Sequence, residues 1–309
     1  NSSAATSPCS KARRSLPSHR INFLFRNSVA FETIRGESGV DFIGSEGVDL
    51  LFALNESGNI TAEGKGGADT MTIANTSGVV GTTTVKGGAG NDTITAANST
   101  GVVGNARFSS AIINGGAGTD NITSLGAVSS VLRGNEDNDN FQLTSNYTNS
   151  TVNGNAGVDT FTVNGNITLS DSKIQGGKDN DGIMNFTGTG AQPGIVSSVD
   201  STINGGKGVD NLTIGNVTTA SNFTVFGGQD ADTITTNNAG ADGITYSGDK
   251  GADVITIAGN ADAIASGGED NDIIIVTGTG NNTLSGDAGN DNFTLGAGDN
   301  VVTGGAGDD

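Results

Sequence analysis

A six-residue turn pattern, Gly-x-x-Gly/Asp-x-Asp, recurs thirteen times at long intervals along this chain of 309 residues, and a further copy, residues 44–49, begins eight residues after the first. Residues 87–92 (GGAGND) form one copy, and a short apolar segment follows each copy that is not at the end of the chain. The interval between copies is 18 to 29 residues and settles to 18 or 19 near the C-terminal end. A repeat of this length is typical of solenoids, in which each coil packs only on its neighbours. The aspartates at the sixth position are Asp41, Asp69, Asp92, Asp120, Asp139, Asp159, Asp181, Asp210, Asp232, Asp253, Asp272, Asp291 and Asp309.

Every copy begins with glycine, from Gly36 to Gly304. A fixed glycine is expected where a turn needs a positive φ angle or a close approach of two backbones. We therefore expect alanine to disturb the structure at any of these positions.

Apolar residues keep a fixed distance from each turn, which predicts short strands with one buried face. Four residues after the aspartate the pattern continues in some copies, as at Leu143, Val163, Ile214, Ile257 and Leu295. Two residues before the first glycine lie Val85, Ile113, Leu132, Val152, Ile174, Ile203, Val225, Tyr246, Leu284 and Val302. Two residues after the aspartate lie Ile94, Ile122, Phe141, Phe161, Ile183, Leu212, Ile234, Ile255, Ile274 and Phe293.

These patterns predict an all-β fold for residues 34–309, a right-handed parallel β-roll or β-helix solenoid with apolar ladders inside. The composition agrees, because 51 glycines and no tryptophan leave little for a compact helical core. Disorder is the alternative for such a chain. A disordered tract, however, has no reason to hold apolar residues at a fixed offset from each aspartate.

Three segments depart from the simple repeat. Residues 1–33 form a basic tail followed by an apolar-alternating stretch, which we interpret as a capping strand or as a strand donated to a neighbouring subunit. Two related inserts, residues 72–81 and 95–104, predict longer connections that bulge on one side. The last four repeats each carry a second, degenerate turn, so each coil there has two strands and two turns. The chain stops inside a repeat, and we expect the solenoid to continue in a longer protein or to be covered by another subunit.

The charge of the repeats restricts the possible partners. Residues 36–309 hold eight Lys/Arg against 32 Asp/Glu, a formal charge of −24. Such a body repels nucleic acid and anionic lipids. One cysteine and one histidine provide no zinc site. No apolar run approaches the roughly 20 residues of a membrane span, so we expect no membrane insertion.

Stacking the coils would place one carboxylate above the next. At the strand spacing of about 4.8 Å, two such charges repel by roughly 3 kcal/mol if the effective dielectric constant is near 20. Glycine turns also direct backbone carbonyls toward the same space. Carboxylate and carbonyl oxygens are the ligands that a hard cation prefers, and calcium tolerates irregular geometry better than magnesium. The sequence therefore predicts multiple Ca²⁺ ions as cofactors.

The residues resemble the calcium-binding repeats-in-toxin (RTX, haemolysin-type) family, whose nonapeptide is Gly-Gly-x-Gly-x-Asp-x-apolar-x. Residues 87–95, 115–123 and 205–213 match it nearly in full, and the resemblance extends over residues 34–309. It implies that the thirteen aspartates donate side-chain oxygens to calcium ions between successive coils. It also implies carbonyl ligands from Gly87, Gly88, Gly115, Gly116, Gly205 and Gly206.

The chain departs from the family pattern at several turns. Aspartate replaces the fourth-position glycine at Asp137, Asp179, Asp230 and Asp270, where it tolerates left-handed geometry and adds a ligand; we include Asp230 and Asp270 in the metal set. The second glycine is replaced by Asn135, Asn155, Asp249, Asp287, Glu37 or Lys65. Long intervals replace one of two tandem motifs, so many coils are expected to bind calcium on one edge only.

We expect no enzyme, because no catalytic set of side chains is visible and Lys178, Lys207 and Lys250 occupy third positions of the turns. The leading hypothesis is an extracellular, calcium-rigidified rod that self-associates in a surface layer, filament or adhesin at the bacterial cell surface. The alternative is a calcium-dependent secretion and folding module of a larger exported enzyme or toxin. A minor possibility is ice or glycan binding by threonine and asparagine ladders on the insert side.

Overall fold

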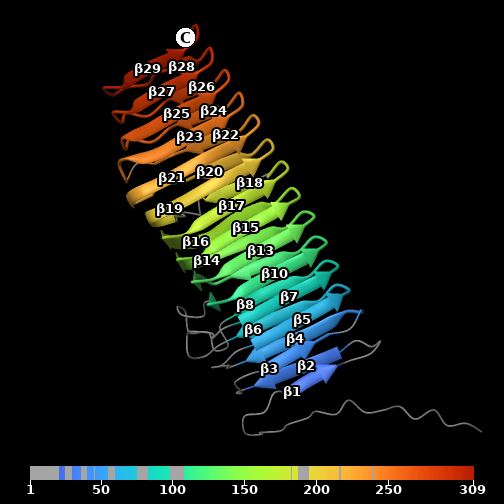
Figure 1. Ribbon diagram of the computed structural model, residues 1–309. Helices are drawn as coiled ribbons and strands as arrows, with labels where there is room; N and C mark the ends of the chain where they lie inside the picture. The colour runs from blue at the N-terminus through green and yellow to red at the C-terminus, as the bar shows by residue number, and fades with distance from the viewer. Residues whose placement is uncertain are drawn as a thin grey trace, which may run out of the picture.

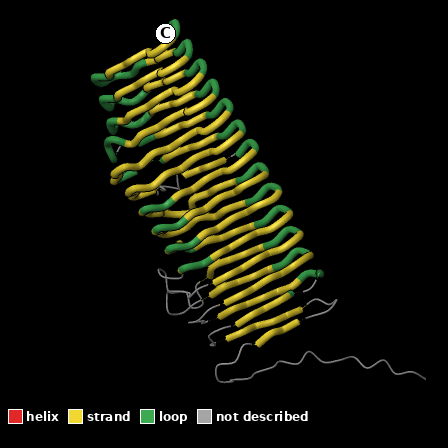
Figure 2. Tube along the Cα trace, viewed as in Figure 1, coloured by secondary structure: helices red, strands yellow, loops and turns green. Residues whose placement is uncertain are grey.

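The computed structural model describes residues 21–24, 30–35, 40–44, 46–54, 60–74, 83–97, 108–181, 183–186, 195–215, 217–238 and 240–309. In this part of the chain the protein is a parallel β-solenoid, as predicted, and strands and turns alternate along a rod (Figures 1 and 2). Each strand pairs in parallel with strands of the neighbouring coils. None of the described residues forms a helix that is long and apolar enough to cross a membrane.

Two main ladders run the length of the rod. Ladder A holds β1 and the strands that lead into the Gly-x-x-Gly/Asp-x-Asp turns from residue 44 onward. Its members are β1 (Ile21–Leu24), β3 (Val40–Ile43), β5 (Ile60–Gly66), β7 (Thr83–Ala89), β10 (Ile112–Ala117), β13 (Val131–Glu136), β15 (Thr151–Ala156), β17 (Lys173–Lys178), β19 (Ile195–Lys207), β21 (Thr219–Gln229), β23 (Ile244–Lys250), β25 (Ala263–Glu269), β27 (Thr283–Ala288) and β29 (Val301–Ala306).

Ladder B holds the strands that leave these turns, together with β2, which ends just before the copy of the pattern at residues 36–41. Its members are β2 (Ala30–Arg35), β4 (Asp49–Leu54), β6 (Thr70–Ala74), β8 (Thr93–Ala97), β11 (Asn121–Ser124), β14 (Asn140–Thr148), β16 (Thr160–Ser170), β18 (Ile183–Phe186), β20 (Asn211–Ile214), β22 (Thr233–Thr236), β24 (Val254–Ile257), β26 (Ile273–Val276) and β28 (Asn292–Thr294). We call the turns from ladder A to ladder B the aspartate edge, and the connections back to ladder A the opposite edge.

A third, shorter ladder widens the middle of the rod. It begins with β9 (Phe108–Ser109) and β12 (Ala127–Val128) and continues through the second halves of β14 and β16 and the first halves of β19 and β21. Part of the extra length of the long intervals in this region is therefore paired between coils, with register shifts between Leu143 and Ser145 and between Ile167 and Thr168. Most of the two inserts expected to bulge, residues 72–81 and 95–104, lies outside the described residues.

The segment that was expected to cap the rod or to leave it pairs within the chain. β1 lies beside β3 and β2 lies beside β4, both in parallel, so the two strands extend ladders A and B. The domain boundary expected at residue 34 falls inside β2. Residues 1–20 lie outside the described part.

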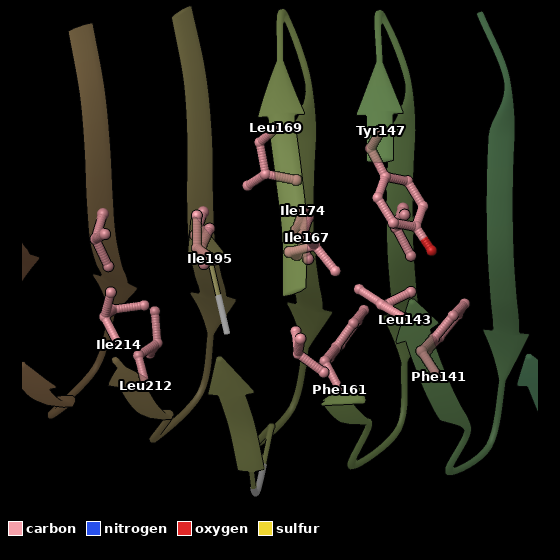
Figure 3. Packing of buried hydrophobic residues seen from close by; sticks show 14 of the residues in the cluster. Phe141, Leu143, Tyr147, Phe161, Ile167, Leu169, Ile174, Ile195, Leu212 and Ile214 are labelled. Atoms are coloured by element: carbon pink, nitrogen blue, oxygen red, sulfur yellow. The ribbon is translucent and has the colours of Figure 1, made fainter. Parts of the chain in front are cut away.

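The apolar ladders predicted from the sequence are buried along most of the rod. Phe141 and Phe161 occupy equivalent places in neighbouring coils, and their rings stack with centroids 4.8 Å apart and planes 4° apart (Figure 3). The ladders are open at the last coil, where Leu295 is 49% and Val302 38% exposed.

One position breaks the expected offset. In β18 it is Met184, three residues after Asp181, that pairs with Phe161 and Leu212. Ile183, which the fixed offset of two residues would place in this ladder, pairs instead with Thr160. One extra residue between the aspartate and the strand shifts the register, and a shift by one residue exchanges the two faces of a strand.

Candidate metal-binding edge

The turns of the aspartate edge have the same backbone conformation in successive coils. The second and fourth positions are left-handed, with glycine in most copies, such as Gly88 (φ 120°) and Gly90 (φ 118°). The aspartates predicted to tolerate this geometry adopt it: φ is 70° at Asp137, 76° at Asp230 and 79° at Asp270.

The glycine at the first position of each turn has a different role from the residues at the second and fourth positions. None of the first-position glycines in the described turns has a positive φ, so its role is close approach. A Cβ on Gly176 would stand closer than about 3 Å both to Oδ2 of Asp181 and to the carbonyl oxygen of Gly205 in the next coil. The same two kinds of oxygen surround Gly64, Gly87, Gly115, Gly154, Gly205, Gly227, Gly248 and Gly286.

The sixth-position aspartates form a continuous buried column. The backbone N–H of each aspartate donates a hydrogen bond of 2.6–3.0 Å to Oδ1 of the aspartate in the next coil. The column runs from Asp49 to Asp309 without a break, and only Asp309 at its end is exposed. Asp92 and Asp159 have no exposed surface, and even Asp291 is only 5% exposed. The carboxylates are thus part of the interior of the rod.

The other carboxylate oxygen, Oδ2, is buried and has no hydrogen-bond partner in most members of the column. It lies beside the first glycine of its own turn and beside the carbonyl of the next coil's first glycine. The aspartates with an unpartnered Oδ2 are Asp69, Asp92, Asp120, Asp139, Asp159, Asp181, Asp210, Asp232, Asp253, Asp272 and Asp291. A buried acceptor without a donor is costly, and a buried charge is more so.

Burial raises the pKa of these carboxyl groups, although the backbone hydrogen bonds to Oδ1 partly oppose the shift. The pKa rises to about 8 at Asp139, Asp181 and Asp232. It rises to about 7 at Asp69, Asp120, Asp159, Asp210 and Asp253, and to about 6 at Asp272. At neutral pH the column therefore favours any species that neutralises it, either protons or cations.

The structure brings most, but not all, of the predicted aspartates together. Asp41 ends the copy at residues 36–41, but it lies in β3 opposite Thr61, before the turn of residues 44–49. It is therefore not part of the column. Asp49, which the predicted set omits, takes the corresponding place at the end of the next turn. The added ligands Asp230 and Asp270 are exposed, and Oδ2 of Asp230 accepts the N–H of Gly208 at 3.2 Å.

The predicted carbonyl ligands divide in the same way. The carbonyls of Gly87, Gly115 and Gly205 point to the place where the preceding coil's Oδ2 is unpartnered. Those of Gly88 and Gly206 instead lie against the second-position residue of the next coil.

A column of serines on the opposite edge was not predicted from the sequence. Ser130, Ser150, Ser172 and Ser201 are almost fully buried in successive coils. Each Oγ accepts a backbone N–H from the preceding coil at 3.0–3.2 Å and donates to a carbonyl two residues earlier at 2.8 Å. The sequence did contain a signal for this column. A serine recurs at the repeat interval, either just before a ladder A strand or within it.

The aspartate column fits a hard cation in its donor chemistry. It supplies only oxygen, from an unpartnered carboxylate and from a carbonyl that converges on the same place, and these are calcium ligands. Within the described residues no three His, Cys, Asp or Glu side chains gather into one metal site. Each ion would therefore have to take backbone carbonyls or water in addition to one or two aspartates. Its charge would neutralise the column and remove the repulsion between its members.

Comparison with known proteins agrees with this chemistry. Residues 77–99 and 276–309 match the family described as the RTX calcium-binding nonapeptide repeat, with four copies. The matched segments include Asp92, Asp291 and Asp309. No curated protein and no solved structure matches the chain. The chain thus carries RTX calcium-binding nonapeptide repeats of the haemolysin type, which typically bind Ca²⁺ and occur in proteins that are generally secreted.

Proposed function

We propose that this chain is an extracellular rod that calcium makes rigid, serving as a structural part of a surface layer, filament or adhesin on a bacterial cell. The observation that supports this proposal best is the unbroken column of aspartates from Asp49 to Asp309, which is buried from Asp49 to Asp291. Because the column extends through every described coil from Asp49 onward, neutralising it affects the whole rod and not one local site.

The column couples folding to the calcium concentration. Without a cation, folding must bury many carboxylates whose Oδ2 atoms have no donor, and this cost opposes the hydrophobic gain. Extracellular calcium modules have dissociation constants of about 10⁻⁴–10⁻³ M, near the calcium concentration outside cells. The chain would then stay unfolded where calcium is scarce and fold after export.

The shape of the molecule favours a structural role over catalysis. The aspartates with raised pKa are enclosed by their own backbone, so no substrate can reach them. We therefore propose that the chain has no enzymatic activity of its own.

A calcium titration followed by small-angle X-ray scattering and sedimentation velocity tests the proposal. We expect calcium, but not magnesium at the same concentration, to convert an expanded chain into a rod, and the rods to associate end to end. A rod that forms equally in chelator at pH 8 would contradict the calcium mechanism. A calcium-dependent rod that stays monomeric at all concentrations would instead favour the second candidate.

The second candidate is a calcium-dependent secretion and folding module of a larger exported enzyme or toxin. The match to haemolysin-type repeats is the observation that favours it. The gene product that contains these residues distinguishes the two: a catalytic domain in the same chain supports the module, whereas further repeats alone support the structural rod.

A further inference from the structure

A groove of about 1020 Å³ runs along the outer face of ladder A. Its lining begins at Asn135 in β13 and ends at Glu269 in β25, with a contribution from every ladder A strand between them. Since these strands follow one another along the rod (Figure 1), the groove is parallel to the rod axis. It can hold an extended polymer that crosses several coils.

The floor of the groove has no side chains in its central coils. Gly177, Gly206 and Gly228 follow one another there in register, as the left-handed second positions of their turns. On one side stands a column of amides, Asn153, Gln175 and Asn204, also in register. The groove is therefore a polar channel with backbone at its base, and it suits a ligand with many hydroxyl groups.

Two lysines stand on the other side of the central channel. Lys178 and Lys207 follow the paired Gly177 and Gly206, so they occupy equivalent places in adjacent coils. Their register neighbours are Ala156 and Gln229, neither of which is acidic. Both lysines are exposed, and no ion pair joins either to another described residue.

This pair of like charges is unusual in a body with a formal charge of −24 over residues 36–309. Equal charges directly opposite on neighbouring strands are unfavourable. Lys250, farther along the same groove, is neutralised by Glu269 at 3.0 Å. Although Glu136, Asp249 and Glu269 also line the groove, Lys178 and Lys207 at its centre are cations unpaired among the described residues, and an anionic group can contact them.

A second, independent observation lies across the channel from the lysines. Oδ1 of Asn204 is buried and accepts no hydrogen bond in the structure. Such an acceptor is normally satisfied by a protein group, by water or by a ligand. Asn204 itself lines the groove, so a rotation of its amide toward the channel would bring this oxygen to a hydroxyl donor of a molecule whose acidic group meets Lys178 or Lys207.

We propose that this groove binds a linear acidic polysaccharide, a chain of sugars that bear carboxylates, laid along the rod axis. Each sugar of such a chain offers hydroxyls to the amide column and a carboxylate to the lysine pair. A polyphosphate backbone offers no comparable set of hydroxyl donors to the amide column, and because its charge is denser, the acidic residues around the groove repel it more strongly than they repel a polysaccharide. The proposal goes beyond the structural role above, and it gives the rod a specific face for attachment.

Polygalacturonate binding to the calcium-loaded full chain, measured by isothermal titration calorimetry, tests the proposal. The double variant Lys178→Gln/Lys207→Gln should bind at least tenfold more weakly, and the affinity of the parent chain should fall as salt rises. Lys173→Gln is the matched control, because Lys173 is an exposed lysine of the same coil that does not line the groove. It should bind like the parent chain.

Several outcomes would overturn the proposal. Equal weakening by Lys173→Gln and by the double variant would mean a general charge effect. Unchanged binding in the double variant would mean that calcium alone bridges the polymer to the acidic rod. Dextran binding as strongly as polygalacturonate would remove the role of the carboxylates, and tighter binding of polyglutamate would indicate a peptide ligand.

Two further measurements support the comparison. Because both lysines are exposed, circular dichroism should show the variants folded. Asn204→Leu, which removes the acceptor and leaves the charge, should also weaken binding several-fold.

Discussion

The two edges of the rod solve the same structural problem with different side chains. On both edges a backbone N–H of one coil donates to a side-chain oxygen of the next. On the opposite edge Ser150 accepts such a bond and donates one of its own, so its hydroxyl is fully used. On the aspartate edge Asp159 accepts the equivalent bond through Oδ1, but its Oδ2 is buried without a partner.

This difference shows that hydrogen bonding between coils does not require carboxylates. Serine supplies the link without charge, without an unpartnered atom and without repulsion between coils. An aspartate in the same role buries a charge, which is unfavourable unless something neutralises it. The aspartate column therefore has a second purpose, and a cation is the species that its oxygen-only surroundings suit.

The C-terminal coils offer an intermediate case on the opposite edge. Asn282 accepts the N–H of Ala263 through Oδ1, as an aspartate of the column would, at 3.0 Å. Its Nδ2 donates to the carbonyl of Gly280 at 2.9 Å. The amide thus satisfies both atoms of the side chain, and this position needs no ion. The contrast between amide and carboxylate in similar turns can be tested directly.

Removal of calcium should have the largest effect, because it acts on every member of the column at once. One site at a hundredfold excess of calcium over its dissociation constant adds about 2.7 kcal/mol, and a few such sites match the whole stability of an ordinary domain. We expect excess EGTA at pH 8 to abolish the β-sheet circular dichroism signal and calcium to restore it. An unchanged signal in EGTA would mean that the aspartate edge needs a cation no more than the serine edge does.

Lowering the pH should partly replace calcium. Burial gives Asp139, Asp181 and Asp232 a pKa of about 8 in the fold, against 3.8 for an unperturbed aspartate. A group with a raised folded-state pKa stabilises the fold below its unfolded pKa, and this contribution is lost as the pH rises through the folded value. In EGTA the melting temperature should therefore fall steadily from pH 4 to pH 8. With saturating calcium the fall should be much smaller, and a rise in EGTA would contradict the burial of the column.

Filling the space beside the first glycine should cost about 3 kcal/mol or more. In Gly176→Ala the new methyl group meets Oδ2 of Asp181 and a backbone carbonyl, neither of which can withdraw without shifting the turn. Gly165→Ala is the control, since Gly165 has a φ of +100° but nothing within 4 Å of its Cβ position. Its expected cost is the backbone term alone, about 1 kcal/mol. Urea unfolding in calcium measures both, and equal losses would mean that conformation, not close approach, selects the first glycine.

The repeat made most of the fold predictable, because one turn pattern recurs with apolar residues at fixed offsets. Phe141 and Phe161 lie in the core as that offset requires. Met184 could not be placed in this way, since one extra residue after Asp181 alters the register and only strand pairing shows it. Asp41 matched the turn pattern in sequence, yet the register of β3 places it in a strand, before the turn of residues 44–49 and outside the aspartate column.

The candidate site was predictable in its residues but not in its details. Spacing identified the aspartates, but their inward orientation depends on the space that the first glycine leaves open. The serine column was missed because it links residues 19 to 29 positions apart through an ordinary side chain. A serine gives no chemical signal in sequence, whereas a repeated carboxylate does.

Changing one carboxylate of the column to an amide should stabilise the fold in EGTA and destabilise it in calcium. In Asp159→Asn the buried charge disappears, and the new Nδ2 can donate to the carbonyl of Gly176, which lies beside the present Oδ2. We expect a gain of about 1–3 kcal/mol in EGTA at pH 8. In calcium the variant lacks one ligand and should be less stable than the parent chain. Urea unfolding under both conditions measures the two signs, and the same sign in both would mean that Asp159 does not contact an ion.

The smallest effect is expected on the opposite edge of the same coil. Ser150→Ala leaves the buried N–H of Ser130 without its acceptor, whereas the carbonyl of Thr148 loses one donor and keeps the N–H of Ser129 at 2.9 Å. The cost of such a loss is about 1–3 kcal/mol, and here the lower part of that range applies because the alanine cavity is small. Since no charge is involved, the loss should be equal in calcium and in EGTA at pH 5, where the protonated column keeps the rod folded. A loss that depends on calcium would mean that the two edges are energetically coupled through the coil, so that an ion bound at the aspartate edge changes the stability of the serine column.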